Sequence, residues 1–286
     1  MIATASHTTT FSAWRDETSS MLEEVSDAPR LEAELLLEYV TGVSRSRQRV
    51  IDDRLTAQQL VQLDNLRRRR VHSEPLAYIL EEAHFWTLKL KVTPAVLIPR
   101  PETELVIERC LHHLDNKPAT VLDLGTGSGA IALAIASERP DINVTACDVS
   151  STALDIARHN MHVLQLSNVE LINSDWFKEV PTQRFNIIVS NPPYIDIDDP
   201  HVQQDVRTHE PHLALFAQHD GLHALQTIIE QASDFLHPEG WLILEHGWQQ
   251  AAKVQELLES HGMRSVASHS DLAGHLRVTE AQRPAS

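Results

Sequence analysis

Residues 121–130 read Val-Leu-Asp-Leu-Gly-Thr-Gly-Ser-Gly-Ala, an apolar run that passes directly into a loop with three glycines. The run 119–124 is typical of a buried strand, and residues 127–137 have the pattern of a helix. Glycine permits a tight turn and a close approach of the backbone to a ligand, and a helix N-terminus favours an anionic group. This stretch therefore predicts a strand, a ligand-binding turn and a helix.

Strand-like and helical stretches alternate along the rest of the chain beyond Pro94. We expect strands at 143–148, 169–173, 185–190 and 241–245, and helices at 153–161, 222–235 and 251–261. A last pair of strands, 264–269 and 275–278, could close the sheet as an antiparallel hairpin. The alternation predicts an α/β fold with a mainly parallel, Rossmann-like sheet.

The N-terminal region has a different pattern. Between residues 11 and 71 the apolar residues recur at helical spacing, which predicts a small helical domain, and the near alternation in 78–92 predicts a short β-hairpin or linker. A chain of 286 residues is long for a single core. We therefore expect two domains, a helical one at 1–84 and, at 85–286, the hairpin linker with the sheet.

The charge balance is strongly acidic, with 24 basic against 40 acidic residues and a net charge of −16. Such a chain is poorly suited to a broad footprint on a phosphate backbone, so we expect no direct binding to DNA. The run Arg67-Arg68-Arg69-Arg70 is the one candidate for a basic patch. It fits a solvated helix end, or a surface that faces a nucleoprotein partner.

Cysteine usage and hydropathy bear on the compartment. Cys110 and Cys147 are the only cysteines, and the 17 histidines do not cluster with Cys, Asp or Glu at metal-ligand spacings. Residues 1–10 lack the charged and apolar regions of a signal peptide, and no stretch reaches the length of a membrane span. We expect a soluble, unprocessed, cytoplasmic protein with no metal and no membrane association.

The tetrapeptide Asn191-Pro192-Pro193-Tyr194 follows the predicted strand 185–190, at the sheet edge where ligands gather in open α/β folds. Two consecutive prolines fix φ and remove two backbone donors, so mostly acceptors remain. The side-chain oxygen of Asn191 and the carbonyl of Pro192 could each take one N–H of a planar NH2 group, with Tyr194 packed on its flat face. A rigid turn that merely ends a strand is the other interpretation.

The cofactor is ambiguous from the glycine-rich loop alone. Asp148 ends the next predicted strand, where a carboxylate can accept hydrogen bonds from ribose hydroxyls. Gly125, Gly127 and Ala130 also fit a dinucleotide-binding pattern, which leaves a nicotinamide dehydrogenase open. No proton-transfer residue stands out for a dehydrogenase, whereas residues 191–194 offer an amine clamp, so a methyl donor is favoured.

Asp175 and Trp176 come shortly after the third predicted strand. A carboxylate could hold the exocyclic amine of an adenine while an indole covers the ring face. The alternative for Trp176 is a side chain that covers the edge of the core.

Several segments together carry a resemblance to a known family. They are Glu74–Leu80, Val96–Glu104, Val121–Ile131, Asn191–Tyr194, Asp220–Leu222, Leu244–Gly247 and Asp271–His275. Through them the chain resembles, over nearly its whole length, the HemK-type protein-(glutamine-N5) methyltransferases, which modify peptide-chain release factors. The glycine-rich loop and the Asn-Pro-Pro-Tyr motif would mark only a broad superfamily, and the sequence Ile-Pro-Arg-Pro-Glu-Thr-Glu adds the specificity. Similar proteins usually have glycine where Glu81-Glu82 stands here.

The resemblance implies a class I methyltransferase fold and S-adenosylmethionine as the cofactor. It implies that the cofactor is bound by Gly125, Thr126, Gly127, Ser128, Gly129, Asp148, Trp176 and Asn191. The glutamine of a release factor's Gly-Gly-Gln motif would bind to the segment 191–194, with Asn191, Pro192 and Tyr194 acting in catalysis. The helical region would help to dock the release factor, and we expect the enzyme to be a monomer.

Two other functions remain open. An adenine-N6 nucleic-acid methyltransferase would use the same clamp on a flipped base, although the acidic charge and the short chain after the clamp disfavour it. A non-catalytic docking module would keep the fold without activity, and the intact glycine-rich loop, Asp148 and Asn191 argue against that. The expected reaction is a direct in-line displacement by the amide nitrogen, and no general base is nominated.

Overall fold

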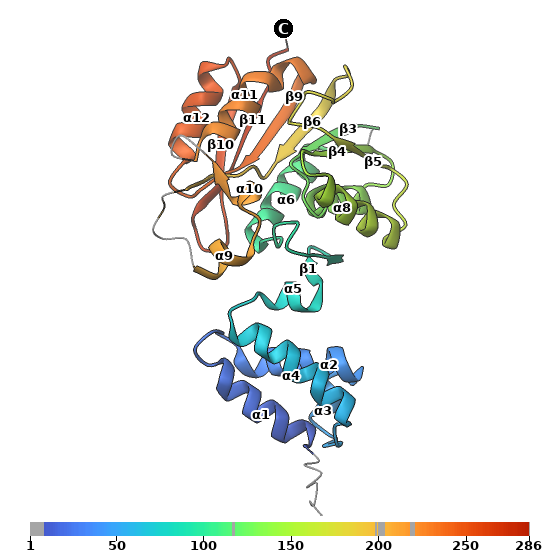
Figure 1. The fold of residues 1–286 in the computed structure, drawn as a ribbon. Helices are drawn as coiled ribbons and strands as arrows, with labels where there is room; N and C mark the ends of the chain where they lie inside the picture. Colours follow the sequence, from blue (N-terminus) through green and yellow to red (C-terminus); the bar gives the residue numbers. More distant parts are fainter. Residues whose placement is uncertain (1–8, 116–117, 198, 200–203, 218–220, 286) are drawn as a thin grey trace, which may run out of the picture. The chain divides into compact units, whose positions relative to one another are not determined.

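The computed structural model describes residues 9–115, 118–197, 199, 204–217 and 221–285, which belong to two compact units, 1–81 and 82–286 (Figure 1). The hairpin lies wholly in the second unit, because β1 (Glu82–Phe85) pairs with β2 (Leu88–Lys91). The division at residue 81 thus falls slightly before the boundary expected at residue 84. Asp220 and residues 1–8, which entered the sequence analysis, lie outside the described residues.

The first unit is helical, which confirms the prediction for this region. Its helices are α1 (Phe11–Leu22), α2 (Pro29–Thr41), α3 (Arg45–Gln48), α4 (Ala57–Val71) and α5 (Leu76–Leu80). They enclose a core around the buried Trp14 and Leu63. Thr56 and Gln59 form a capping box that fixes the start of α4, since each side chain satisfies a backbone N–H at the helix end.

The four-arginine run lies at the end of α4 and is used inside the helical unit. Arg70 is buried and pairs with Glu32 at 2.6 Å, and Arg67 pairs with Asp64 at 2.9 Å. Arg69 also has an acidic partner in the same unit. Arg70 thus joins α4 to α2, and the acidic partners of Arg67 and Arg69 neutralise their charge, so the run is not a continuous basic surface.

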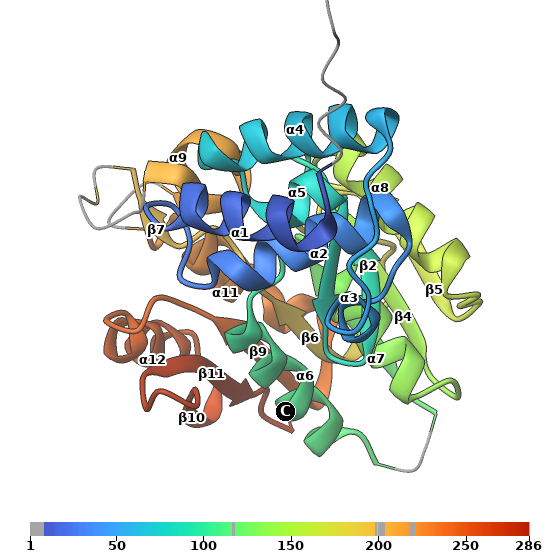
Figure 2. The same cartoon turned by 90° about the horizontal axis from the view of Figure 1, so that it is seen from below.

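The second unit is built on a seven-stranded sheet. Its strands are β3 (Thr120–Leu124), β4 (Asn143–Asp148), β5 (Val169–Asn173), β6 (Phe185–Ser190), β9 (Leu236–Glu245), β10 (Arg264–Ser270) and β11 (Leu276–Gln282). Their order across the sheet is β10-β11-β9-β6-β3-β4-β5, and the labels β10, β11, β9, β6, β4 and β5 follow one another in this order across Figure 2. The five strands from β9 to β5 are parallel, and β11 and β10 are antiparallel to their neighbours, which confirms the predicted hairpin.

Helices cover both faces of this sheet. They are α6 (Glu104–His113), α7 (Ala130–Glu138) and α8 (Ser151–Val163) on one face, and α11 (His223–Phe235) and α12 (Ala251–Ser260) on the other. Successive residues of a strand point to opposite faces, so Ile187 and Val189 join one core cluster and Ile188 joins the other. Strands buried on both sides explain the continuous apolar runs in the sequence.

Short elements between β6 and α11 had no counterpart in the sequence analysis. They are β7 (Ile195–Asp196), α9 (Gln204–His209), α10 (His212–Leu215) and β8 (Phe216–Ala217). A 3-10 turn, η1 (Pro101–Thr103), precedes α6. Cys110 and Cys147 are both buried and free. In the part of the chain described here, no helix combines the length and the apolar character needed to cross a membrane.

Candidate functional site

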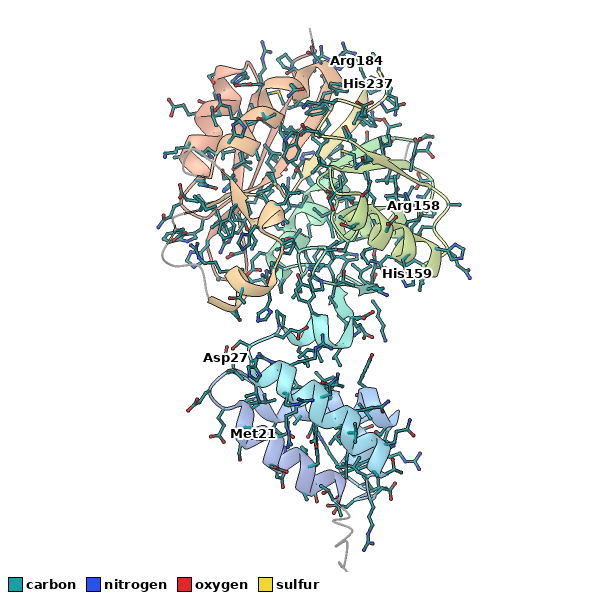
Figure 3. The ribbon with its side chains drawn as sticks, viewed as in Figure 1. Met21, Asp27, Arg158, His159, Arg184 and His237 are labelled. Carbon is teal, nitrogen blue, oxygen red and sulfur yellow. The ribbon has the colours of Figure 1, made fainter. Side chains whose placement is uncertain are left out.

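The strand register brings the predicted site residues together. In the sheet, Leu124 at the end of β3 pairs with Ser190 at the end of β6 and with Cys147 near the end of β4. The residues that follow Leu124, Ser190 and Cys147 in the chain are Gly125, Asn191 and Asp148. They therefore lie side by side at the carboxyl edge of the sheet. Arg184 and His237, labelled in Figure 3, mark the opposite edge, where β6 and β9 begin.

A cavity of about 620 Å³ lies at this carboxyl edge, within the size range of small-molecule sites. The predicted residues that line it are Gly125, Thr126, Gly127, Ser128, Asp148, Trp176, Asn191 and Pro193. Gly129, Pro192 and Tyr194 were also predicted to take part in the site but do not line the cavity. Its wall is completed by side chains that were not predicted, among them Leu97, Thr103, Val149 and Phe216.

The glycine-rich loop has a left-handed backbone at each of its glycines, with φ of +73° at Gly125, +56° at Gly127 and +84° at Gly129. Gly129 serves packing, because an added Cβ would lie 2.9 Å from Leu133 Cδ1 and 3.3 Å from Ala157 Cβ. Its role is therefore to let α7 begin close to α8, while the cavity itself is lined by the glycines before it.

Asp148 is fixed at the cavity wall by the backbone around it. Its Oδ2 accepts a hydrogen bond from the Gly127 N–H at 2.9 Å, and its Oδ1 accepts one from the Ser150 N–H at 2.9 Å. Burial raises the pKa of Asp148 in spite of these hydrogen bonds, which favour the carboxylate. The carboxylate thus ties the glycine-rich loop to the start of α8 and retains lone pairs for a ligand.

Trp176 is held in an uncommon left-handed conformation, with φ of +52°, and its carbonyl accepts the Ser174 hydroxyl at 2.7 Å. Its ring lies over the glycine-rich loop, since a Cβ on Gly125 would be 3.7 Å from Trp176 Cζ3. Asp175 also lines the cavity and pairs with Lys178 at 2.5 Å. Trp176 both lines the cavity and packs against the core edge, so its role as a cover for the core is confirmed and its contact with an adenine stays a prediction.

The Asn-Pro-Pro-Tyr loop is fixed at both ends by side-chain hydrogen bonds. The Nδ2 of Asn191 donates to Thr103 Oγ1 at 3.1 Å, and the Tyr194 hydroxyl donates to Glu245 Oε1 at 3.0 Å. Gln250 Nε2 donates to the Tyr194 carbonyl at 3.0 Å. In the structure the Tyr194 ring packs against the core rather than toward a ligand in the cavity.

Glu245 lies at the end of β9 and was not predicted to belong to the site. Burial raises its pKa to about 7, although the nearby Thr103 and the Tyr194 hydroxyl, which donates a hydrogen bond to the carboxylate, oppose this. Burial, followed by the nearby Glu245, also raises the pKa of Tyr194 well above its ordinary value. The signal for Glu245 was a carboxylate directly after the apolar run 241–244, the same pattern that identified Asp148.

Hydrogen bonds of Glu210, which together form a brace, join two further segments that line the cavity. Glu210 is buried and accepts from the Arg100 guanidinium and, at 3.4 Å, from the Ile98 N–H. Leu97 and Pro211, which flank this brace, both line the cavity. The Ile-Pro-Arg-Pro-Glu-Thr-Glu segment therefore shapes the wall of the site. Among the residues with described positions, no group of three or more His, Cys, Asp or Glu could hold a metal ion.

Comparison with known proteins gives a consistent result. Residues 13–80 match the family described as PrmC N-terminal domain, and residues 103–209 match the family described as methyltransferase small domain. The release factor glutamine methyltransferase of Yersinia pestis is 46% identical over 90% of this chain and 93% of its own. The enzyme of the same name from Escherichia coli is 44% identical over 93% of this chain and 96% of its own.

Solved structures support the fold. A methyltransferase from Pyrococcus furiosus has a TM-score of 0.53 at 20% identity, and the match covers 77% of this chain and 99% of that one. A ribosomal protein L11 methylase from Lactobacillus delbrueckii has a TM-score of 0.51 at 19% identity, covering 68% of this chain and 85% of that one. The predicted class I methyltransferase fold with a helical N-terminal region is confirmed.

Proposed function

The chain belongs to the release factor glutamine methyltransferase family, and we propose that it transfers a methyl group from S-adenosylmethionine to the side-chain amide nitrogen of the glutamine in the Gly-Gly-Gln motif of class 1 release factors. The cavity at the carboxyl edge of the sheet would hold the cofactor, and the segment 191–194 would hold the glutamine. The bound cofactor supplies an electrophilic methyl group.

The residues around the cavity suit this cofactor. The Asp148 carboxylate is already oriented by two backbone N–H groups and can accept hydrogen bonds from ribose hydroxyls. The exposed face of Trp176 and the side chain of Val149 offer apolar surface for an adenine, with Asp175 beside them. The glycine-rich loop lets the backbone approach the ligand closely.

The Asn-Pro-Pro-Tyr loop, residues 191–194, would activate the glutamine amide, and we call it the acceptor loop. An amide nitrogen is a poor nucleophile because its lone pair is delocalised into the carbonyl group. In our proposal the Asn191 Oδ1 and the Pro192 carbonyl each accept one N–H of that amide, which aims the nitrogen and stabilises the positive charge that develops on it. Tyr194 would act by fixing the end of the loop, since its hydroxyl donates a hydrogen bond to Glu245.

The observation that carries the proposal is the pairing of Leu124 with Ser190, because it sets the glycine-rich loop and Asn191 side by side on one cavity. Asn191→Ala removes the side-chain acceptor and should abolish transfer while the fold is preserved, as measured by circular dichroism. Asn186→Ala is the matched control in the preceding strand β6, since Asn186 Oδ1 accepts the Thr120 N–H at the opposite edge of the sheet. Near-normal turnover by Asn191→Ala would remove the proposed clamp.

The partner and compartment follow from the same proposal. The helical N-terminal region would dock the release factor, and the enzyme would act as a monomer in the cytoplasm, where its two free cysteines remain reduced. The net charge of −16 and the internal ion pairs of the four-arginine run support a protein substrate over a nucleic acid. No association with DNA or a membrane is part of this proposal.

A further inference from the structure

Asn160 is a buried polar side chain that the proposed reaction does not use. It lies in α8, is 2% exposed and does not line the cavity. Burying an amide is costly unless its oxygen and its NH2 group are hydrogen-bonded. Both groups of Asn160 have partners, and these partners belong to two other parts of the chain, the glycine-rich loop and the hairpin.

The glycine-rich loop supplies one of these partners. The Nδ2 of Asn160 donates to the backbone carbonyl of Ser128 at 2.9 Å. Ser128 lines the cavity and directly precedes Gly129, the cap of α7. The first turn of α7 uses the Gly129 carbonyl, which accepts the Leu133 N–H at 2.8 Å. A buried carbonyl needs a partner of its own, and Asn160 provides one for Ser128.

The hairpin supplies the other two partners, both at Lys91, the last residue of β2. The Oδ1 of Asn160 accepts the Lys91 N–H at 2.7 Å, and its Nδ2 donates to the Lys91 carbonyl at 3.0 Å. The N–H can meet only the amide oxygen, and the carbonyl can meet only the NH2 group. The backbone of Lys91 therefore sets the orientation in which Asn160 presents its NH2 group to Ser128.

The hairpin is fixed to the helices on the same face of the sheet. The Trp86 N–H donates to Glu104 Oε1 at 2.8 Å, at the start of α6, and Trp86 Nε1 donates to Glu138 Oε1 at 2.7 Å, at the end of α7. The inward-facing side chains of both hairpin strands belong to the core cluster of this face. The end of β2 is thus a fixed point, and the hydrogen bonds of Asn160 connect the glycine-rich loop to it.

We propose that Asn160 is a positioning residue that holds the glycine-rich loop in its cofactor-binding conformation before S-adenosylmethionine arrives. This rests on the proposed placement of the cofactor in the cavity. Asn160 does not touch the cofactor in this scheme and acts through the Ser128 carbonyl. A protein binds more weakly in proportion to the fraction of molecules that lack the binding conformation. Asn160 therefore contributes to cofactor affinity and not to the methyl-transfer step.

Asn160→Ala removes the three hydrogen bonds of this side chain. We expect the Kd for S-adenosylmethionine, measured by calorimetry, to rise about tenfold, the effect of losing one hydrogen bond to the loop. At saturating cofactor kcat should fall no more than twofold, because the bound cofactor selects the loop conformation that fits it. A merely structural loss would instead lower the fraction of active enzyme, and so kcat, without changing the Kd.

Asn168→Ala is the matched control. The Nδ2 of Asn168 also donates to three backbone carbonyls of the second unit, those of Ala136, Arg139 and Ile142, at 3.2, 3.3 and 3.1 Å. These residues lie at the edge where β4 and β5 begin, and they do not line the cavity. Asn168→Ala should therefore lower the melting temperature and keep the Kd within twofold of the wild type.

Hydrogen exchange follows the loop directly, without turnover. In the cofactor-free wild type the amides of residues 127 and 129 should be protected, since the Gly127 N–H donates to Asp148 and the Gly129 N–H to the Thr126 carbonyl. We expect the same protection in cofactor-free Asn168→Ala. In Asn160→Ala these amides should exchange faster, and added S-adenosylmethionine should restore their protection.

Equal Kd values for the wild type and folded Asn160→Ala would overturn the positioning role and leave the proposed function standing. An equal rise in the Kd of Asn168→Ala would overturn it as well. So would a loop that exchanges freely in the cofactor-free wild type, a result that does not depend on any variant folding. If the wild type itself binds no S-adenosylmethionine, the proposed function fails.

Discussion

A Cβ added at Gly221 would lie 2.1 Å from the backbone carbonyl oxygen of Tyr194, a distance that no pair of nonbonded atoms tolerates. Gly221 also has φ of +77°, a conformation that residues with a Cβ rarely adopt. Both its backbone conformation and its close contact with the acceptor loop therefore require glycine. We expect Gly221→Ala to shift the loop and lower turnover by about a hundredfold, the cost of a misplacement of about 1 Å. Steady-state methylation of a release factor measures this.

The control for this variant is Gly262→Ala. Gly262 has φ of +78°, but no atom lies within 4 Å of an added Cβ. Gly262→Ala should therefore lose about 1 kcal/mol of stability through backbone strain alone and keep its activity. Equal turnover in the two variants would show that the contact between Gly221 and Tyr194 has no bearing on the site.

Asp148→Asn should weaken cofactor binding. An amide at this position must turn its NH2 group toward one of the two backbone N–H donors that now share the carboxylate, those of Gly127 and Ser150. Hydrogen bonds to charged groups contribute about 1.5–3 kcal/mol, so the Kd for S-adenosylmethionine should rise about 10- to 100-fold. Calorimetry tests this against Asp155→Asn, a change on the exposed side of α8 that should leave the Kd unaltered.

The stability of the protein should depend on pH through Glu245. Burial raises its pKa from 4.5 to about 7, with Tyr194 and Arg277 lowering it and Glu102 raising it. Because the folded-state pKa lies above the unfolded one, the stabilising contribution is complete below about pH 4.5 and is lost as the pH rises through 7. The buried Asp123, whose pKa is also raised to about 7, adds to the same trend.

Glu245→Gln should remove one of these two contributions, so the free energy of unfolding of the variant should fall less steeply between pH 4.5 and 7. At pH 8 the variant should be more stable than the wild type, by at most roughly 3 kcal/mol. Urea unfolding at several pH values measures the difference. Parallel pH profiles for the two proteins would contradict the assignment of a raised pKa to Glu245.

The backbone conformation at Glu81 explains why similar proteins usually have glycine after the Tyr-Ile-Leu segment. It ends α5 with φ of +54° and ψ of +34°, a left-handed conformation that costs a residue with a Cβ about 1–2 kcal/mol. Glu81→Gly should stabilise the protein by about 1 kcal/mol, as read from its urea midpoint. Glu82→Gly, one residue along in the extended strand β1, should instead destabilise it by roughly 0.5–1 kcal/mol.

The central strand β6 could be predicted because a strand buried on both faces leaves an apolar run, and the edge strand β5 because its short apolar segment stands between turn residues. The predicted strands 143–148, 169–173 and 185–190 coincide with β4, β5 and β6. The elements between residues 195 and 217 were not predicted, since strands of two residues and helices of four to six are too short to display a period. Their formation depends on contacts with the rest of the unit.

The position of the candidate site could be predicted from the sequence, whereas the orientation of its side chains could not. Asp148 ends one parallel strand and Asn191 follows another, and parallel strands end at one edge of the sheet, so their proximity follows from topology. The orientation of Tyr194 depends on Glu245, 51 residues away, and that of Asn191 on Thr103, 88 residues away. No local pattern encodes partners at such separations.

The acceptor loop should direct the methyl group to a glutamine amide. The most direct measurement is to incubate the enzyme with isotopically labelled S-adenosylmethionine, a release factor and duplex DNA together, and to locate the label by mass spectrometry. We expect label on the side-chain nitrogen of the glutamine in the Gly-Gly-Gln motif, and none with Asn191→Ala. Label on adenine, or on no protein glutamine, would contradict it.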